Sequence, residues 1–196
     1  MSRVRTSLLV AALAAAGAAQ WVSAAQKPKA YTAPETFTSP LQAHSKGGSA
    51  AATIRIQIDR YTPEADRTSI SDALRHGGYP NFLGALRKAP VVGAVEVGDV
   101  KVPVRWAREQ PTAKGGRDIS VVTESPVHFV GGGRADAKPR TGFEIAVVRL
   151  TVDELGLGTG TMAAAAKVKP DGQGGVSLED YAEEPIKLTF VQRAIK

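Results

Sequence analysis

Residues 54–59 read IRIQID, and this alternation carries most of the information about the fold class. Ile54, Ile56 and Ile58 fall on one side of an extended chain, while the polar side chains between them fall on the other. A strand with one apolar face needs a buried layer beneath that face. The segment therefore predicts a half-buried strand in a packed sheet.

The spacing of apolar residues changes from a strand pattern to a helical pattern after this strand, at Thr62. Threonine can cap free backbone amides, and Pro63 fits the first position of a helix, so a helix is expected to start here. His76-Gly77-Gly78 is a typical helix stop, and a second short apolar stripe covers residues 80–88. We expect an inserted helical hairpin at about residues 62–89, with its apolar side against the sheet.

Short β segments make up most of the remaining chain. The expected strands are residues 37–43, 54–58, 95–97, 102–106, 119–123, 127–130, 143–152, 162–168 and 186–190. Residues 143–152 are apolar on both faces at first, which indicates a central strand. Residues 162–168 contain four alanines, which favour helix, but the glycines before them and Val168 favour a strand. The fold class is therefore mainly β: an antiparallel sandwich or partly closed barrel of about nine to ten short strands.

Residues 1–25 predict a removable export signal. Arg3 and Arg5 precede an apolar run, and small residues follow it, in the order that signal peptides use. As a helix that run spans only about 18 Å, too short for a hydrocarbon core of about 30 Å. We expect residues 26–34 to be a flexible leader, residues 35–196 to be one domain, and the product to be periplasmic or extracellular.

The composition excludes several classes of chemistry. The chain has no cysteine, so disulfides, thiolate nucleophiles and cysteine-bound metals are ruled out. Its excess of six positive charges is spread thinly over 196 residues, so we expect no nucleic-acid partner. No later apolar run is long enough for a membrane span. Such a chain is typical of a soluble bacterial envelope or secreted protein.

Catalytic motifs are not found. No two histidines have the close spacing of a helical metal pair, and the serine-hydrolase elbow G-x-S-x-G does not occur. The basic loop after Gly131-Gly132-Gly133 is the most suggestive segment, because glycine amides and cations can hold an anion. We name four candidate ligand-binding residues there: His128, Arg134, Asp136 and Arg140.

Two further segments have simpler interpretations. Asp171 to Gly175 is acidic and glycine-rich, but it lacks the ligand at the fifth position of a calcium loop, so we interpret it as a turn joined to a solvated acidic segment through Glu184. Trp106 follows Val102 and Val104 at strand spacing, so we expect it on the core face.

These observations favour a non-catalytic binding or interaction module, with an unknown protein or glycan as partner. The first alternative is a carrier of small apolar ligands, in which a barrel is capped by the helical hairpin. The second is a hydrolase-type enzyme whose site is assembled from dispersed residues. No cofactor and no metal are expected.

Overall fold

The computed structural model describes residues 33–45, 48–113, 115–128, 141–170, 176–180 and 185–194. In these residues the chain forms nine strands and one helix. The elements are β1 (Glu35–Ser45), β2 (Gly48–Ile58), α1 (Glu64–Lys88), β3 (Gly93–Val97), β4 (Val100–Pro111), β5 (Arg117–Thr123), β6 (Ile145–Val152), β7 (Leu157–Pro170), β8 (Val176–Asp180) and β9 (Ile186–Arg193). The expected signal peptide lies outside the described residues and stays a prediction.

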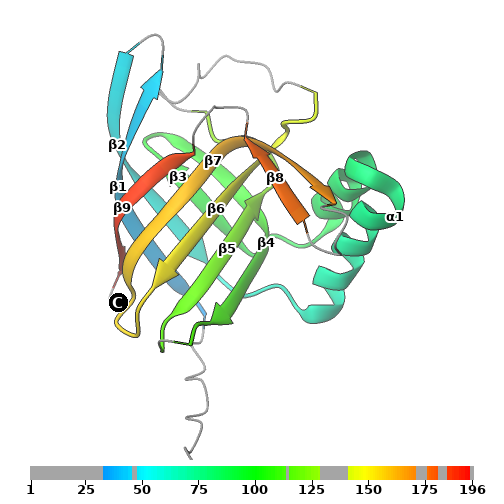
Figure 1. The fold of residues 1–196 in the computed structure, drawn as a ribbon, viewed down its shortest axis with the longest axis horizontal. Coiled ribbons are helices and arrows are strands. Elements are labelled where there is room, and N and C mark those ends of the chain that lie inside the picture. Colours follow the sequence, from blue (N-terminus) through cyan, green and yellow to red (C-terminus); the bar gives the residue numbers. More distant parts are fainter. Residues whose placement is uncertain are drawn as a thin grey trace, which may run out of the picture.

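Eight of the strands close into an antiparallel barrel (Figure 1). Each strand from β1 to β7 pairs with the next one along the chain, β7 pairs with β9, and β9 closes the ring by pairing with β1. The strand β8 pairs with the far half of β7 and lies outside the ring. The predicted antiparallel β fold is confirmed, and the barrel is fully closed.

The inside of the barrel is packed with aliphatic side chains. Ile54, Ile56 and Ile58 of β2 are fully buried there, as their alternation predicts. The other strands contribute in the same way, and the central members of this cluster include Phe37, Leu41, Val95, Val104, Ile119, Val121, Val148, Leu150, Met162, Leu188 and Val191. The interior is therefore a hydrophobic core.

A second apolar cluster lies outside the barrel, between its wall and α1 (Figure 1). The outward-facing residues of β6 take part, which explains why that strand is apolar on both faces. The cluster comprises Ile70, Leu74, Phe82, Leu86, Val122, Ile145, Val147, Ala163, Ala166 and Val168. The helical hairpin packs on the outer face of the barrel wall through this cluster. No helix in the described part of the chain has the length and apolar character to cross a bilayer.

The helical insertion is a kinked pair, as predicted. Its break is at Gly78, whose φ of 70° lies in the left-handed region that favours glycine. The predicted cap at Thr62 is wrong, since the first helical turn has no side-chain cap. The Thr62 hydroxyl instead accepts a hydrogen bond from the Ala107 amide at 2.9 Å, which ties the helix start to β4.

The predicted core position of Trp106 is also wrong. The pairing of β4 with β5 shifts register between Val104 and Trp106, so a bulge inserts an extra residue there. Val104 and Ala107 remain inside the barrel, while Trp106 packs against the cluster under α1. One irregular residue thus moves a large side chain to the other face of the sheet.

The alanine-rich segment is confirmed as a strand, within β7. Before it, Gly158 and Gly160 allow neighbouring backbone to come close: a Cβ on Gly158 would lie 1.9 Å from the carbonyl oxygen of Thr151. Residues 176–180 form β8, where we expected a solvated acidic segment. Residues 127–128 are not a strand, although residues 127–130 were predicted to be one.

Candidate functional site

Of the four predicted ligand-binding residues, the structure describes only His128. Arg134, Asp136 and Arg140 lie outside the described residues, so their grouping with His128 stays a prediction. The His128 side chain is half-buried, and its Nε2 atom is buried with no hydrogen-bond partner among the described residues. Among the described residues, no three metal-ligating side chains come together.

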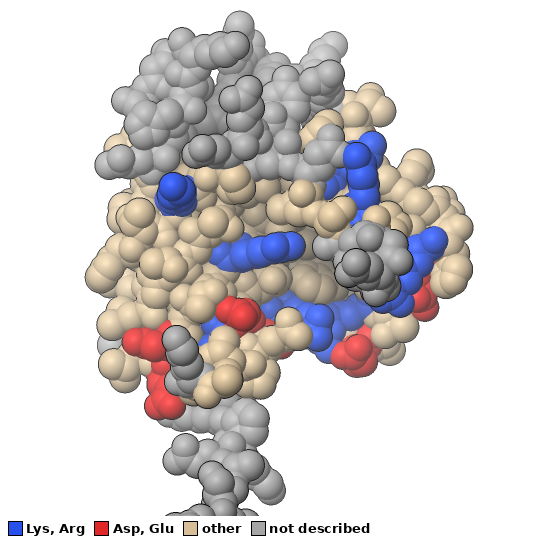
Figure 2. Space-filling view, viewed as in Figure 1, with Lys and Arg blue, Asp and Glu red and all other residues tan. Residues whose placement is uncertain are grey.

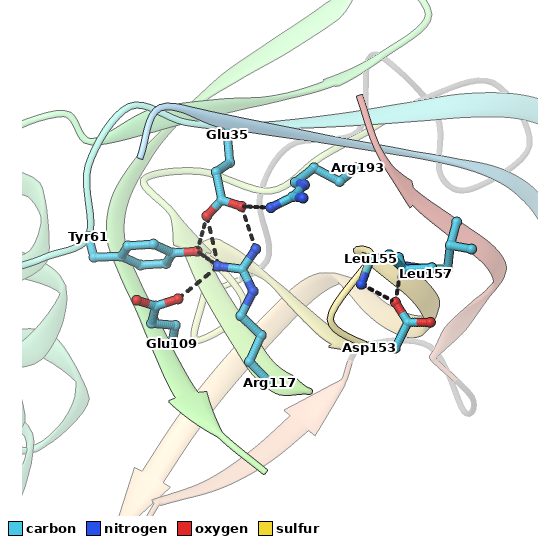
Figure 3. Close-up of polar contacts among 8 residues, drawn as sticks. All are labelled: Glu35, Tyr61, Glu109, Arg117, Asp153, Leu155, Leu157 and Arg193. Carbon is cyan, nitrogen blue, oxygen red and sulfur yellow. Dashed lines mark hydrogen bonds and ion pairs between the residues drawn. The ribbon is translucent and has the colours of Figure 1, made fainter. Parts of the chain in front are cut away.

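A group of interacting charged side chains lies at the end of the barrel where β5 begins, called here the Arg117 end. Five polar residues meet there from distant parts of the chain: Glu35, Tyr61, Glu109, Arg117 and Arg193 (Figure 3). They come from the start of β1, the connection after β2, the end of β4, the start of β5 and the end of β9.

Arg117 is the centre of this cluster and only 1% exposed. Its Nη1 atom donates to Glu35 Oε1 and Glu109 Oε2, both at 2.8 Å, and to the Tyr61 hydroxyl at 3.2 Å. Its Nη2 atom makes an ion pair with the second oxygen of Glu35, so the contact is bidentate. The guanidinium also lies 5.7 Å from the centre of the Phe37 ring.

Glu35 has two further partners. Tyr61 donates its hydroxyl proton to Glu35 Oε1 at 3.0 Å, and Arg193 Nη1 lies 3.6 Å from Oε2. The two glutamates balance the two arginines, so the cluster carries no net formal charge. A buried charge is tolerated where it is paired and hydrogen-bonded in this way.

The pKa values at this end move away from neutrality. Burial raises the pKa of Glu35, but hydrogen bonds and charge from Arg117 outweigh it, so that pKa is below its usual range. Burial and the charge of Glu35 raise the pKa of Tyr61. Burial opposes the charge of Arg117, but its hydrogen bonds to Glu35 and Glu109 raise the pKa overall. These three groups keep fixed protonation states near pH 7, so they are poorly suited to general acid–base chemistry.

The cluster closes this end of the barrel, and the alternation of residues along β1 and β5 indicates where its central pair lies. Arg117 precedes Ile119 by two residues, and Glu35 precedes Phe37 by two, so both follow the inward face of their strands. Extending each apolar alternation by one step places both charges inside. The predicted strands begin at their first apolar residues, Phe37 and Ile119, so the prediction does not include Glu35 and Arg117.

The opposite end, called here the Val127 end, is closed by apolar packing. The segment after β5 spans from β4 to β7: the Glu124 amide donates to the Pro103 carbonyl at 3.0 Å, and the Val127 amide to that of Ala164 at 2.9 Å. Val127 is fully buried in the interior cluster. Both ends of the barrel are therefore filled by the protein's own side chains.

Two hollows lie on the outer surface. One, of about 570 Å³, lies along the helical hairpin between its two halves. The other, of about 460 Å³, lies beside β2 at the Val127 end of the barrel. Its lining residues are Ala51, Ala52, Thr53, Arg55, Glu96 and Gly98.

An exposed apolar patch lies on the outer wall near the Arg117 end, formed by Leu155, Leu157 and Phe190. Their exposed fractions are 72%, 42% and 55%. Asp153 holds the turn rigid, because its carboxylate accepts from the amides of Leu155 at 2.9 Å and Leu157 at 2.8 Å (Figure 3). In Figure 2 the left part of the face is uncharged along its middle, with acidic side chains at its lower end.

Comparisons with known proteins add no assignment: no family model, no curated protein and no solved structure matches the chain.

Proposed function

We propose that this chain is an exported, non-catalytic β-barrel module that binds a partner through its outer surface, in the periplasm or outside the cell. The observation that carries the proposal is the filled interior, with ion pairs closing one end and Val127 closing the other. A barrel that binds a small molecule inside needs an enclosed cavity of a few hundred Å³. In this barrel, the side chains of the hydrophobic core occupy the interior.

The outer surface supplies the second support. Small soluble proteins rarely hold large apolar side chains in an exposed, rigid position, and such positions are frequent in interaction sites. Leu155 is the most exposed of the three patch residues, and the turn that presents it is fixed by two hydrogen bonds from Asp153. This is the arrangement expected of a preformed contact surface.

The charge pattern agrees with a protein or glycan partner. Basic and acidic side chains are interspersed along the lower half of the face in Figure 2. Nucleic acids need a dense basic surface for phosphate contacts, so a polypeptide or glycan fits better.

The test is a substrate panel together with retention of a partner. The purified full chain is offered ester, glycoside, phosphoester and peptide substrates, and we expect no turnover above buffer. Turnover that survives repurification and disappears in His128→Ala would replace the proposal with the hydrolase alternative. The second arm uses an envelope extract from the native cell with the wild type and Leu155→Ser. We expect the exposed apolar patch to contribute to retention, so the serine variant retains less partner.

A further inference from the structure

The strand β2 extends beyond the neighbour that covers its edge. β2 comprises Gly48–Ile58, but its pairing with β3 begins only at Ile54, opposite Val97. The chain then turns away at Gly98, which has a φ of 57°. Residues 48–53 therefore pair with β1 on one side and with no other described strand.

An unpaired strand edge presents backbone N–H and C=O groups that are ready to pair with another chain. Proteins commonly protect such an edge with charged residues or proline. Residues 48–53 read GSAAAT and contain neither, and the first charged residue is Arg55. Among the described residues, no strand and no charged side chain covers this edge.

The hollow of about 460 Å³ lies directly along this edge. Ala51 and Thr53, both exposed, line its outer-face side, and Gly98 closes the end next to β3. These small side chains leave room that a larger side chain on an added strand would fill. The edge offers affinity through its backbone, and the hollow offers side-chain specificity.

We infer that the edge of β2 at residues 48–53 binds an extended peptide segment of another protein by strand addition. The inference deepens the proposed function and rests on it. The added strand runs antiparallel to β2, in line with β3 beyond Gly98. Six residues of extended chain cover about 20 Å, which matches the unpaired length.

The side chains favour a different protein over a second copy of this chain. A second copy would present its own GSAAAT edge, whose small side chains leave the hollow empty. Charge gives a further preference. Glu96 makes an ion pair with Lys101 at 2.8 Å, while Arg55 makes no ion pair with a described residue. The partner segment should therefore carry bulky apolar residues at alternate positions and a carboxylate near Arg55.

The test uses one designed probe, the acetylated hexapeptide Asp-Thr-Leu-Thr-Leu-Thr with fluorescein at its C-terminus. In the antiparallel register its aspartate lies opposite Thr53, diagonal to Arg55, and its first leucine lies opposite Ala51. The full chain is titrated by fluorescence anisotropy, and amide shifts are followed by NMR. We expect saturable binding below about 1 mM, with shifts concentrated at residues 48–53 and Gly98.

Two controls distinguish strand addition from non-specific binding of the peptide. The first is the same peptide with alternate amides N-methylated, which removes its hydrogen bonds along one edge. The second is Ala51→Trp, which fills the hollow, matched with Thr161→Trp on β7, a strand paired on both sides there. We expect at least a tenfold loss of affinity from N-methylation and from Ala51→Trp, and little change from Thr161→Trp.

Four results would overturn the inference, and the last of them bears on the edge alone. One is the absence of saturable binding, and another is binding that neither control weakens. The third is a stable dimer in light scattering that Ala51→Trp abolishes, since that would assign the edge to a second copy. A partner from the native extract that Ala51→Trp still retains would sink this edge assignment while leaving the proposed function standing.

Discussion

The two ends of the barrel are closed by different kinds of interaction. At the Arg117 end, four charged side chains and the Tyr61 hydroxyl, from five separated segments, pair with one another. At the Val127 end, one continuous segment bends inward and places an aliphatic side chain in the interior. The ionic closure is held by directional contacts between charged side chains, whereas the apolar closure combines backbone hydrogen bonds with the packing of an aliphatic side chain. The edge of β2 at residues 48–53 lies at the Val127 end, so the ionic closure and the proposed binding edge are at opposite ends of the barrel.

The largest expected effect comes from breaking the ionic closure. Arg117→Ala leaves Glu35 buried without its main partner, and removal of one member of a buried ion pair costs about 3–5 kcal/mol. We expect a loss of that size in the free energy of unfolding, measured by urea denaturation. Arg149→Ala, on the exposed outer face of β6, is the matched control and should change stability by less than about 0.5 kcal/mol. Equal effects from the two variants would mean that Arg117 does not hold this end.

The apolar end should be less sensitive. Val127→Ala removes two buried methyl groups, and we expect a loss of about 2 kcal/mol. The comparison is made under the same urea conditions, with Val91→Ala at a half-exposed site as the control. A loss from Val127→Ala larger than that from Arg117→Ala would reverse the ranking of the two ends.

A double replacement separates the value of the ion pair from the cost of breaking it. Glu35→Gln with Arg117→Met removes both charges and keeps most of the side-chain volume. The charges that then lose a partner are those of Glu109 and Arg193, which are partly exposed, and no fully buried charge is left unpaired. We therefore expect a smaller loss than in Arg117→Ala, about 1–2 kcal/mol. A loss as large as that of the single variant would show that packing, and not charge pairing, dominates this end.

Acid should weaken the ionic end selectively. The folded pKa of Glu35 lies below its ordinary value of 4.5, so its pairing contributes stability above that pH. This contribution is lost as the pH falls through the lower, folded pKa. The difference in stability between wild type and Glu35→Gln should therefore shrink below about pH 4.5. Thermal unfolding across that range measures it, and a difference that is constant with pH would contradict the assignment.

The sequence predicts the regular parts of this fold well. The alternation at Ile54, Ile56 and Ile58, the helix break at Gly78 and the strand in the alanine-rich segment are all confirmed, because each depends on neighbouring residues. The features that fail depend on irregular or distant partners. The bulge before Trp106 changes its face, and Thr62 bonds to β4 instead of capping the helix.

The charged cluster shows where sequence reasoning stops. Arg117 and Glu35 lie 82 positions apart, and only the strand order of the closed barrel brings them together. Alternation alone places each of them on the inward face of its strand, but it does not show that the two side chains meet. The pairing also needs the topology, and many strand orders fit the same pattern.

The central claim is that the barrel interior is a filled core, so that binding takes place outside. Native mass spectrometry of the protein isolated from its own cells tests this most directly. The account predicts a mass equal to that of the polypeptide alone under conditions that retain non-covalent ligands. A small apolar molecule that co-purifies, and that is released only when the protein unfolds, would contradict it and establish the carrier alternative.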